Sequence, residues 1–175
     1  YRLGDAFARR NTVIRYFEAR NPDEVLERIT DANVITVSMM WRNDWLDKAP
    51  KLALVQSVSA GMNQFDIARF KSAGVRLASA QGVNARAVAE HAIALILSLS
   101  RQLHLARDNQ HNKFWRGMIG DPGSREDELQ GKTVLIAGLG GIGSRLAQLA
   151  KACDMKVIGT RRDPSKGAAG ADEVF

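Results

Sequence analysis

A glycine-rich turn is the segment of this sequence with the clearest chemical meaning. Residues 138–143 read Gly-Leu-Gly-Gly-Ile-Gly, and an apolar run at residues 132–137 leads directly into them. An amphipathic helical pattern follows the turn, and a second β-rich run lies at residues 155–159. A G-x-G-x-x-G turn is common, but between a buried strand and a helix it indicates a dinucleotide-binding loop rather than a plain structural turn.

The glycines of this turn have separate physical roles. Gly138 allows the tight turn, Gly140 lets the backbone approach a pyrophosphate, and Gly143 lets the helix pack closely on the strand. The free N–H groups of the loop and the positive end of the helix dipole supply the anion site. The loop residues predicted to bind the cofactor are Gly138, Gly140, Gly141, Ile142 and Gly143.

The residues about twenty positions further on decide which dinucleotide is bound. An acidic side chain there accepts hydrogen bonds from the adenosine ribose and favours NAD. This chain has Thr160-Arg161-Arg162 instead, and the planar guanidinium of arginine suits a phosphate. Thr160, Arg161 and Arg162 are therefore predicted to bind NADP through its 2′-phosphate. In the alternative, the arginines are solvated, Asp163 reaches the ribose, and the cofactor is NAD.

Strands and helices alternate at short spacing ahead of the glycine turn. Runs rich in β-branched residues predict strands, and helix signals such as Asn21-Pro22-Asp23-Glu24 lie between them. The predicted strands are residues 12–17, 33–37, 51–58 and 75–78, and the predicted helices are residues 21–29, 44–48 and 63–72, the last with Phe65, Ala68 and Phe70 inward. This alternation predicts an α/β fold with a parallel sheet covered on both faces.

A longer helix is predicted over residues 84–108, with Asn84 as its N-cap. Its main apolar stripe is formed by Val88, Ala92, Leu95, Leu99 and Leu103. Ile93 and Leu97 lie on another face, so the middle of the helix is apolar almost all round. Such a helix is buried on more than one side, between domains or against a second subunit. The pattern lapses over residues 109–130, which predict a surface connection.

Composition excludes several classes of protein. The 25 basic and 19 acidic residues give a net charge of +6, but the basic residues are scattered and no nucleic-acid-binding motif accompanies them. Cys153 is the only cysteine, which predicts no disulfide and no metal cluster and suits a cytoplasmic location. The longest uncharged run of the central helix, residues 92–100, is too short for a membrane span, so no membrane partner is expected.

Three segments together carry a family resemblance: residues 57–66, 84–101 (with Ala87-Val88-Ala89-Glu90-His91) and 129–162. Their order and spacing resemble the D-isomer-specific 2-hydroxyacid dehydrogenases, which include glyoxylate/hydroxypyruvate reductases and phosphoglycerate dehydrogenase. The resemblance implies a flavodoxin-like substrate domain, present in part over residues 1–83, followed by the first part of a Rossmann dinucleotide-binding domain over residues 84–175. It also implies a homodimer formed through the long helix.

The resemblance further implies a substrate site. The turn Ser59-Ala60-Gly61 would present N–H groups to the substrate carboxylate, the alternative being a plain strand-to-helix turn. Met39 and Met40, with Trp41, would line the substrate side, unless they are core packing. The Ala80-Gln81 turn would lie near the nicotinamide end of the cofactor.

Catalytic residues are expected to be absent from this chain. The resemblance implies an arginine, a glutamate and a histidine beyond a point matching Phe175, and His91, His104 and His111 do not match that histidine. Tyr1-Arg2-Leu3 does not resemble a natural start, and the last residues resemble the entry to a further strand, so both ends are expected to be incomplete.

Two functions are consistent with these features. The first is an oxidoreductase that transfers a hydride between NADP(H) and a small 2-oxo acid or D-2-hydroxy acid, with glyoxylate, hydroxypyruvate, pyruvate and bulkier acids all possible substrates. The second is a non-catalytic dinucleotide-binding interaction module of the same fold, similar to the C-terminal-binding corepressors.

Overall fold

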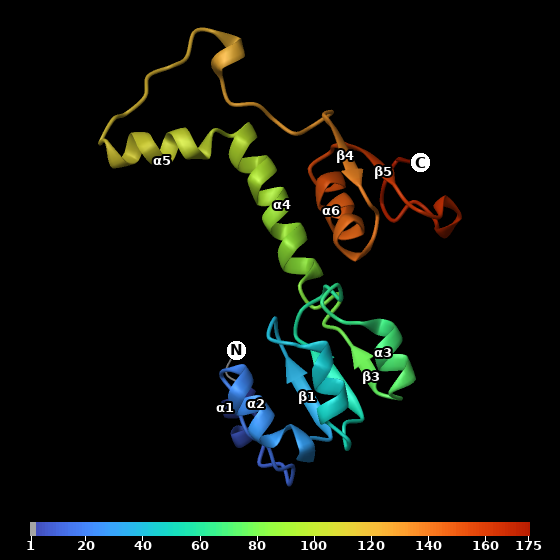
Figure 1. The fold of residues 1–175 in the computed structure, drawn as a ribbon. Coiled ribbons are helices and arrows are strands. Elements are labelled where there is room, and N and C mark those ends of the chain that lie inside the picture. Colours follow the sequence, from blue (N-terminus) through green and yellow to red (C-terminus); the bar gives the residue numbers. More distant parts are fainter. Residues whose placement is uncertain (1–2) are drawn as a thin grey trace. The chain divides into compact units, whose positions relative to one another are not determined.

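The computed structural model describes residues 3–175, and the chain divides into two compact units (Figure 1). The first unit is Tyr1–Gln81 and the second is Gly82–Phe175. Each contains a three-stranded sheet whose paired strands are all parallel. The predicted α/β class with parallel sheets is therefore confirmed. Within the described residues, no helix is long and apolar enough to cross a membrane.

The first unit is built on a sheet with the strand order β1-β2-β3. The strands are β1 (Val34–Val37), β2 (Leu54–Ser57) and β3 (Arg76–Ala78). The helices are α1 (Leu3–Arg9), α2 (Pro22–Arg28) and α3 (Ile67–Ser72), with 3-10 segments η1 (Ile29–Asp31) and η2 (Asn43–Lys48). Asn21 caps α2 as the sequence predicts, because its side chain accepts the N–H of Glu24 at 2.9 Å.

Aromatic side chains fill much of the core of this unit. Trp45 is completely buried, and the ring of Trp41 lies 5.6 Å from it in an edge-on arrangement. Phe65 and Phe70 pack against Trp41 with ring centroids 5.8 and 5.2 Å away. Rings at these separations contribute packing energy beyond the area they bury, so they fix η2 and α3 against the sheet.

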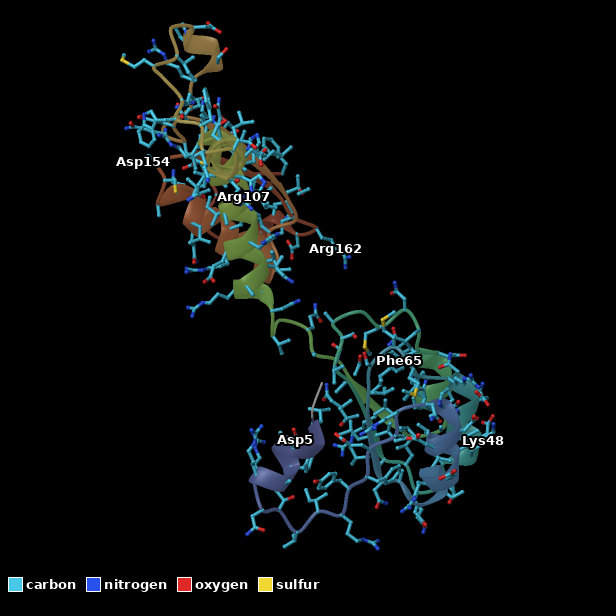
Figure 2. The ribbon with its side chains drawn as sticks, turned by 90° about the vertical axis from the view of Figure 1, so that its left-hand side faces the viewer. Asp5, Lys48, Phe65, Arg107, Asp154 and Arg162 are labelled. Atoms are coloured by element: carbon cyan, nitrogen blue, oxygen red, sulfur yellow. The ribbon has the colours of Figure 1, made fainter. Side chains whose placement is uncertain are left out.

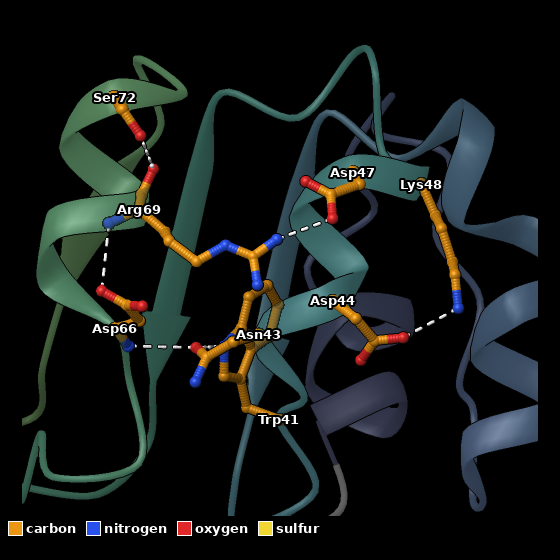
Figure 3. A network of polar contacts seen from close by, with 8 residues as sticks. All are labelled: Trp41, Asn43, Asp44, Asp47, Lys48, Asp66, Arg69 and Ser72. Carbon is orange, nitrogen blue, oxygen red and sulfur yellow. Dashed lines mark hydrogen bonds and ion pairs between the residues drawn. The ribbon is translucent and has the colours of Figure 1, made fainter.

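A polar network joins η2 to the start of α3 (Figure 3). The Asn43 side chain accepts hydrogen bonds from the indole N–H of Trp41 at 2.9 Å and from the backbone N–H of Asp66 at 3.0 Å. Its amide group also donates to the carbonyl of Gln64 at 3.2 Å. Arg69 of α3 pairs with Asp47 of η2 at 2.6 Å. This network restrains the segment between β2 and α3.

The second unit has the strand order β4-β5-β6. The strands are β4 (Thr133–Ala137), β5 (Lys156–Thr160) and β6 (Glu173–Val174). The helices are α4 (Ala85–Ser100), α5 (Leu103–His111) and α6 (Gly141–Lys151), with 3-10 segments η3 (Pro122–Ser124) and η4 (Pro164–Lys166). The final residues do form a strand, as their pattern predicts.

Small residues let α4 pack closely on α6 in this unit. Ala89 of α4 and Ala147 and Ala150 of α6 are completely buried. Ile93 and Leu97 of α4 pack against the same core cluster. The α4 face that carries Ala89, Ile93 and Leu97 is therefore the one that faces the core.

The main apolar stripe predicted for the long helix lies on a face of α4 that points away from this core. Val88, Leu95 and Leu99 are exposed in the isolated chain. The predicted burial on more than one side is seen for one side only, the minor face with Ile93 and Leu97, and burial of the main stripe stays a prediction. The exposed stripe has no partner within residues 3–175.

Three local predictions were wrong. Residues 12–17 form no strand, because the run pairs with no other strand among residues 3–175 and a strand needs ladder partners. The predicted helix 84–108 is two helices, separated at Gln102, which has a left-handed φ of 49°. The predicted helix 63–72 is regular only from Ile67, where Asp66 caps it, and Ala68 is exposed rather than inward.

Candidate functional site

The glycine turn lies between the end of β4 and the start of α6. Gly138 has a φ of +102°, which L side chains rarely adopt, so the tight turn predicted at this position requires glycine. Its N–H donates to the hydroxyl of Thr160 at 3.1 Å, and the N–H of Leu139 donates to the carbonyl of Thr160 at 2.8 Å. The end of β5 therefore holds the first half of the turn.

Gly143 is the position of closest packing. A Cβ atom built there lies 2.0 Å from the carbonyl oxygen of Gly138, a separation that no side chain tolerates. By contrast, a Cβ atom at Gly140 has no neighbour within 4 Å. Gly143 is thus required by the fold of this chain, whereas the space at Gly140 stays open to whatever approaches the loop.

The turn presents a set of unpaired donors. The N–H groups of Gly140, Gly141 and Ile142 donate to no other group within residues 3–175, and all three residues are exposed. They precede or begin α6, whose 11 residues place the positive end of its dipole at the same point. Unpaired amides at a helix N-terminus favour an anion, so the turn fits the pyrophosphate of a dinucleotide.

The three residues after β5 differ in their contacts. The Arg161 guanidinium donates to the carbonyls of Lys166 and Gly167 at 3.1 and 3.0 Å. Asp163 caps η4 by accepting the N–H of Ser165 at 3.2 Å. Arg162 is exposed and extends away from the ribbon (Figure 2). The structure brings Thr160 to the glycine turn, while the two arginines have different surroundings.

The candidate carboxylate-binding turn belongs to the first unit. Ser57 is completely buried, and its hydroxyl accepts the N–H of Ser59 at 3.1 Å and donates to the Ser59 carbonyl at 3.2 Å. The N–H of Ala80 also donates to that carbonyl, at 3.1 Å, so the predicted residues Ser59 and Ala80 lie together.

The next two residues of this turn leave donors available. The N–H groups of Ala60 and Gly61 have no partner within residues 3–175, and both residues are exposed. A Cβ atom at Gly61 has no neighbour within 4 Å, so packing within this chain does not require glycine there. That glycine leaves room here for an approaching anion stays a prediction, beside the alternative of a plain strand-to-helix turn.

The residues after β1 differ from one another. Met39 is 85% exposed, Met40 packs partly against the core, and Trp41 is buried. Core packing, the alternative for this segment, therefore accounts for Trp41 and for part of Met40. Met39 is available to a ligand.

The three histidines of the chain lie on the helices α4 and α5. His91, His104 and His111 are all exposed, and no group of His, Cys, Asp or Glu side chains is arranged to hold a metal ion within the described part of the chain. The expectation that none of these histidines is the family's catalytic histidine stays a prediction.

Sequence reasoning missed two residues that position the first unit's turn. The Ser57 hydroxyl holds Ser59 by a hydrogen bond, and the Asn43 side chain holds the segment that follows the turn. Ser57 ends an apolar strand, and a buried hydroxyl at such a position is a usable signal. Asn43 gives no signal in the sequence, because a single asparagine in a short 3-10 segment has many possible partners.

The family comparison agrees with the residue pattern. The family model for the D-isomer specific 2-hydroxyacid dehydrogenase catalytic domain matches residues 3–148. The chain is 33% identical over 138 residues to D-3-phosphoglycerate dehydrogenase of Dictyostelium discoideum, covering 78% of this chain and 33% of that protein. The chain belongs to the D-isomer specific 2-hydroxyacid dehydrogenase family.

Solved structures of the family have a similar fold. A D-isomer specific 2-hydroxyacid dehydrogenase family protein from Aeromonas salmonicida matches with a TM-score of 0.77 and 27% identity, covering 98% of this chain and 53% of that one. D-lactate dehydrogenase from Aquifex aeolicus, solved with NAD and lactic acid, matches with a TM-score of 0.69 and 26% identity, covering 85% and 45%. The chain therefore spans about half of these solved chains and a third of the Dictyostelium protein.

Proposed function

We propose that the protein containing this chain is an NADP(H)-dependent reductase of small 2-oxo acids, acting in reverse as a D-2-hydroxyacid dehydrogenase. The observation that carries this proposal is the set of unpaired amides at the glycine turn, which adjoins Thr160-Arg161-Arg162 where NAD-binding folds have an acid. The cofactor supplies the hydride chemistry, and the protein binds and orients it. Family membership supports the oxidoreductase class.

In this proposal the two parts of the chain have different tasks. Residues 1–83 bind the substrate and residues 84–175 bind the dinucleotide. The unpaired N–H groups of Ala60 and Gly61 bind the substrate carboxylate, with Ser59 held in place by Ser57. The relatives' names support a carboxylate ligand, since the Aquifex enzyme was solved with lactic acid.

The support for an NADP preference comes from the segment of residues 160–162 and not from family membership. The Aquifex relative was solved with NAD, so family membership does not select NADP. An arginine pair after β5 favours a phosphate because guanidinium groups donate two parallel hydrogen bonds to phosphate oxygens. Asp163, the residue on which the NAD alternative depends, accepts hydrogen bonds from Ser165 instead.

The proposed assembly is a homodimer formed through unit 2. The stripe of α4 is exposed, and so is a further set of apolar side chains, here called the apolar arm: Leu103, Leu105, Phe114, Trp115 and Met118. Four members of the arm, Leu103, Leu105, Phe114 and Trp115, line a groove of about 1220 Å³ beside α5. Exposed apolar side chains on this scale favour a protein partner, and the resemblance names a second copy as that partner.

The test uses the complete protein that contains this chain. Oxidation of NADPH and, separately, NADH is followed by absorbance with glyoxylate, hydroxypyruvate and pyruvate, and each nucleotide is also titrated directly. We expect turnover with NADPH preferred over NADH. Turnover with NADH preferred would overturn the cofactor assignment alone. Nucleotide binding without turnover on these acids or on a panel of bulkier 2-oxo acids would instead support the non-catalytic interaction module.

A further inference from the structure

The side chains of residues 160–163, at the end of β5 and just beyond it, differ in their hydrogen bonding. The side chains of Thr160, Arg161 and Asp163 all bond to groups within unit 2, whereas no partner exists for the Arg162 side chain within residues 3–175. Adjacent arginines in a sequence are therefore not equivalent in the structure.

Arg161 is anchored at both its backbone and its side chain. Its N–H donates to the carbonyl of Phe175 at 2.8 Å, which continues the pairing of β5 with β6. One guanidinium nitrogen then donates to the two carbonyls of Lys166 and Gly167 at the end of η4. A guanidinium used in this way closes the loop between β5 and β6.

The loop that Arg161 closes has a conformation that needs such a restraint. Gly167, Ala169 and Gly170 all have positive φ values, of 85°, 50° and 94°. Its only regular segment is η4, three residues long and capped by Asp163. Because short 3-10 segments have weak internal hydrogen bonds, the side chains of Arg161 and Asp163 supply much of the order.

Arg162 differs in every one of these respects. Its side chain is exposed and has no acceptor within the described chain, and it lies two residues beyond the end of β5, which contacts the glycine turn. We propose that Arg162 alone binds the 2′-phosphate of NADP. Arg161 is a positioning residue: it holds the β5–β6 loop and so fixes the backbone from which the Arg162 side chain extends. This inference rests on the proposed NADP(H) dependence and divides the arginine pair into two roles.

Substitution at each arginine gives a different expected pattern in nucleotide binding. Arg162→Ala removes a charge-assisted contact to the phosphate, so the Kd for NADPH rises about tenfold or more while the Kd for NADH changes less than about twofold. Arg161→Ala loosens the loop under both cofactors, so both Kd values rise by a similar factor and their ratio is kept. Arg161→Lys restores part of the affinity, because an ammonium group also donates to carbonyls.

The experiment measures binding by the complete protein, with hydrogen exchange as a second readout. NADPH, NADH and adenosine 2′,5′-bisphosphate are titrated into the wild type, the three variants and Arg20→Ala, which removes an exposed arginine from the first unit. Arg161→Ala is expected to speed amide exchange over residues 164–170, and Arg162→Ala is expected to leave it unchanged.

The outcomes separate this inference from the proposed function. If the wild type binds neither NADPH nor the bisphosphate, the proposed NADP(H) dependence fails, and this inference fails with it. If the wild type prefers NADPH but Arg161→Ala abolishes the preference, or Arg162→Ala retains it, the division of roles is wrong and the proposed function stands. Loss of the NADPH preference in Arg162→Ala only, with faster amide exchange in Arg161→Ala only, supports both the proposed NADP(H) dependence and the division of roles.

Discussion

The hydroxyl of Thr160 accepts a hydrogen bond from the backbone N–H of Gly138 at 3.1 Å, which joins the end of β5 to the first residue of the glycine turn. Gly138 has a left-handed backbone, so its N–H has no strand or helix partner and depends on this hydroxyl. The bond orients the turn whose later amides are proposed to bind pyrophosphate. Thr160 therefore acts on the cofactor site through the turn, whichever dinucleotide is bound.

Replacing Thr160 with valine is expected to weaken binding of both nucleotides. The variant keeps the shape of the side chain but leaves the Gly138 N–H without its acceptor, so the Kd values for NADPH and NADH rise by about two- to tenfold together. Fluorescence titration of each nucleotide measures the change. Thr160→Ser is the matched control, since it keeps the hydroxyl and should bind like the wild type. An increase in Kd confined to NADPH would show instead that Thr160 contacts the 2′-phosphate.

Gly143 and Gly141 form a second matched pair. Gly143→Ala places a Cβ atom 2.0 Å from the Gly138 carbonyl, so the free energy of unfolding is expected to fall by about 1–3 kcal/mol or more. Gly141→Ala meets only the Ala85 side chain at 3.8 Å and should leave stability near that of the wild type. Urea denaturation followed by circular dichroism tests both. Equal stability of the two variants would contradict the close packing of α6 on the turn.

The Asp172 carboxylate links the sheet and helix of unit 2 and gives the stability a pH dependence. Its pKa is lowered by the hydrogen bond from the Lys151 ammonium at 2.8 Å, by the N–H of Val157 at 2.8 Å and by the charges of Lys151 and Lys156. A lowered folded-state pKa means that the contribution is complete above the unfolded-state value of about 3.9 and is lost as the pH falls through the folded-state pKa.

Asp172→Asn is therefore expected to be less stable than the wild type at pH 7, with the difference shrinking below about pH 4. Thermal melts at pH 7, 5, 4 and 3 measure this. In a Lys151→Met background the same substitution should have a smaller effect, because the first cause of the shift has been removed. A difference between variant and wild type that is constant with pH would contradict the assignment.

The strands of both sheets were predictable because their apolar runs are short, continuous and separated by clear turn signals. β4 and β5 lie within one residue of the predicted runs, and Gly138 and Gly143 have the conformation and packing that their spacing predicts. These features depend on residues close together in the sequence. The different surroundings of Arg161 and Arg162 were not predictable, because those of Arg161 depend on carbonyls at residues 166 and 167.

The break in the long helix was also beyond sequence reasoning. No glycine or proline marks it, and a left-handed Gln102 is unusual for a residue with a side chain. The structure gives the reason: the Gln102 side chain donates to the carbonyls of Ser124 and Arg125, both at 3.1 Å, more than twenty residues away. At Gln102 a tertiary contact thus overrides helix propensity. At residues 12–17 the lack of a strand partner overrides β propensity.

Trp115 is the best position at which to test the proposed homodimer. Its side chain is 94% exposed in the isolated chain, and it borders the groove beside α5. An exposed tryptophan next to exposed Phe114 and Met118 is stabilised only if a partner covers it, and tryptophan side chains are frequent energetic centres of interfaces. Trp115→Ser is therefore expected to raise the dimer dissociation constant by about tenfold or more, measured by sedimentation equilibrium.

Val13→Ser removes a fully exposed apolar side chain from the first unit and should leave dissociation unchanged. A monomeric wild type would remove the homodimer proposal, and a Trp115→Ser dimer as tight as the wild type would move the interface away from the apolar arm.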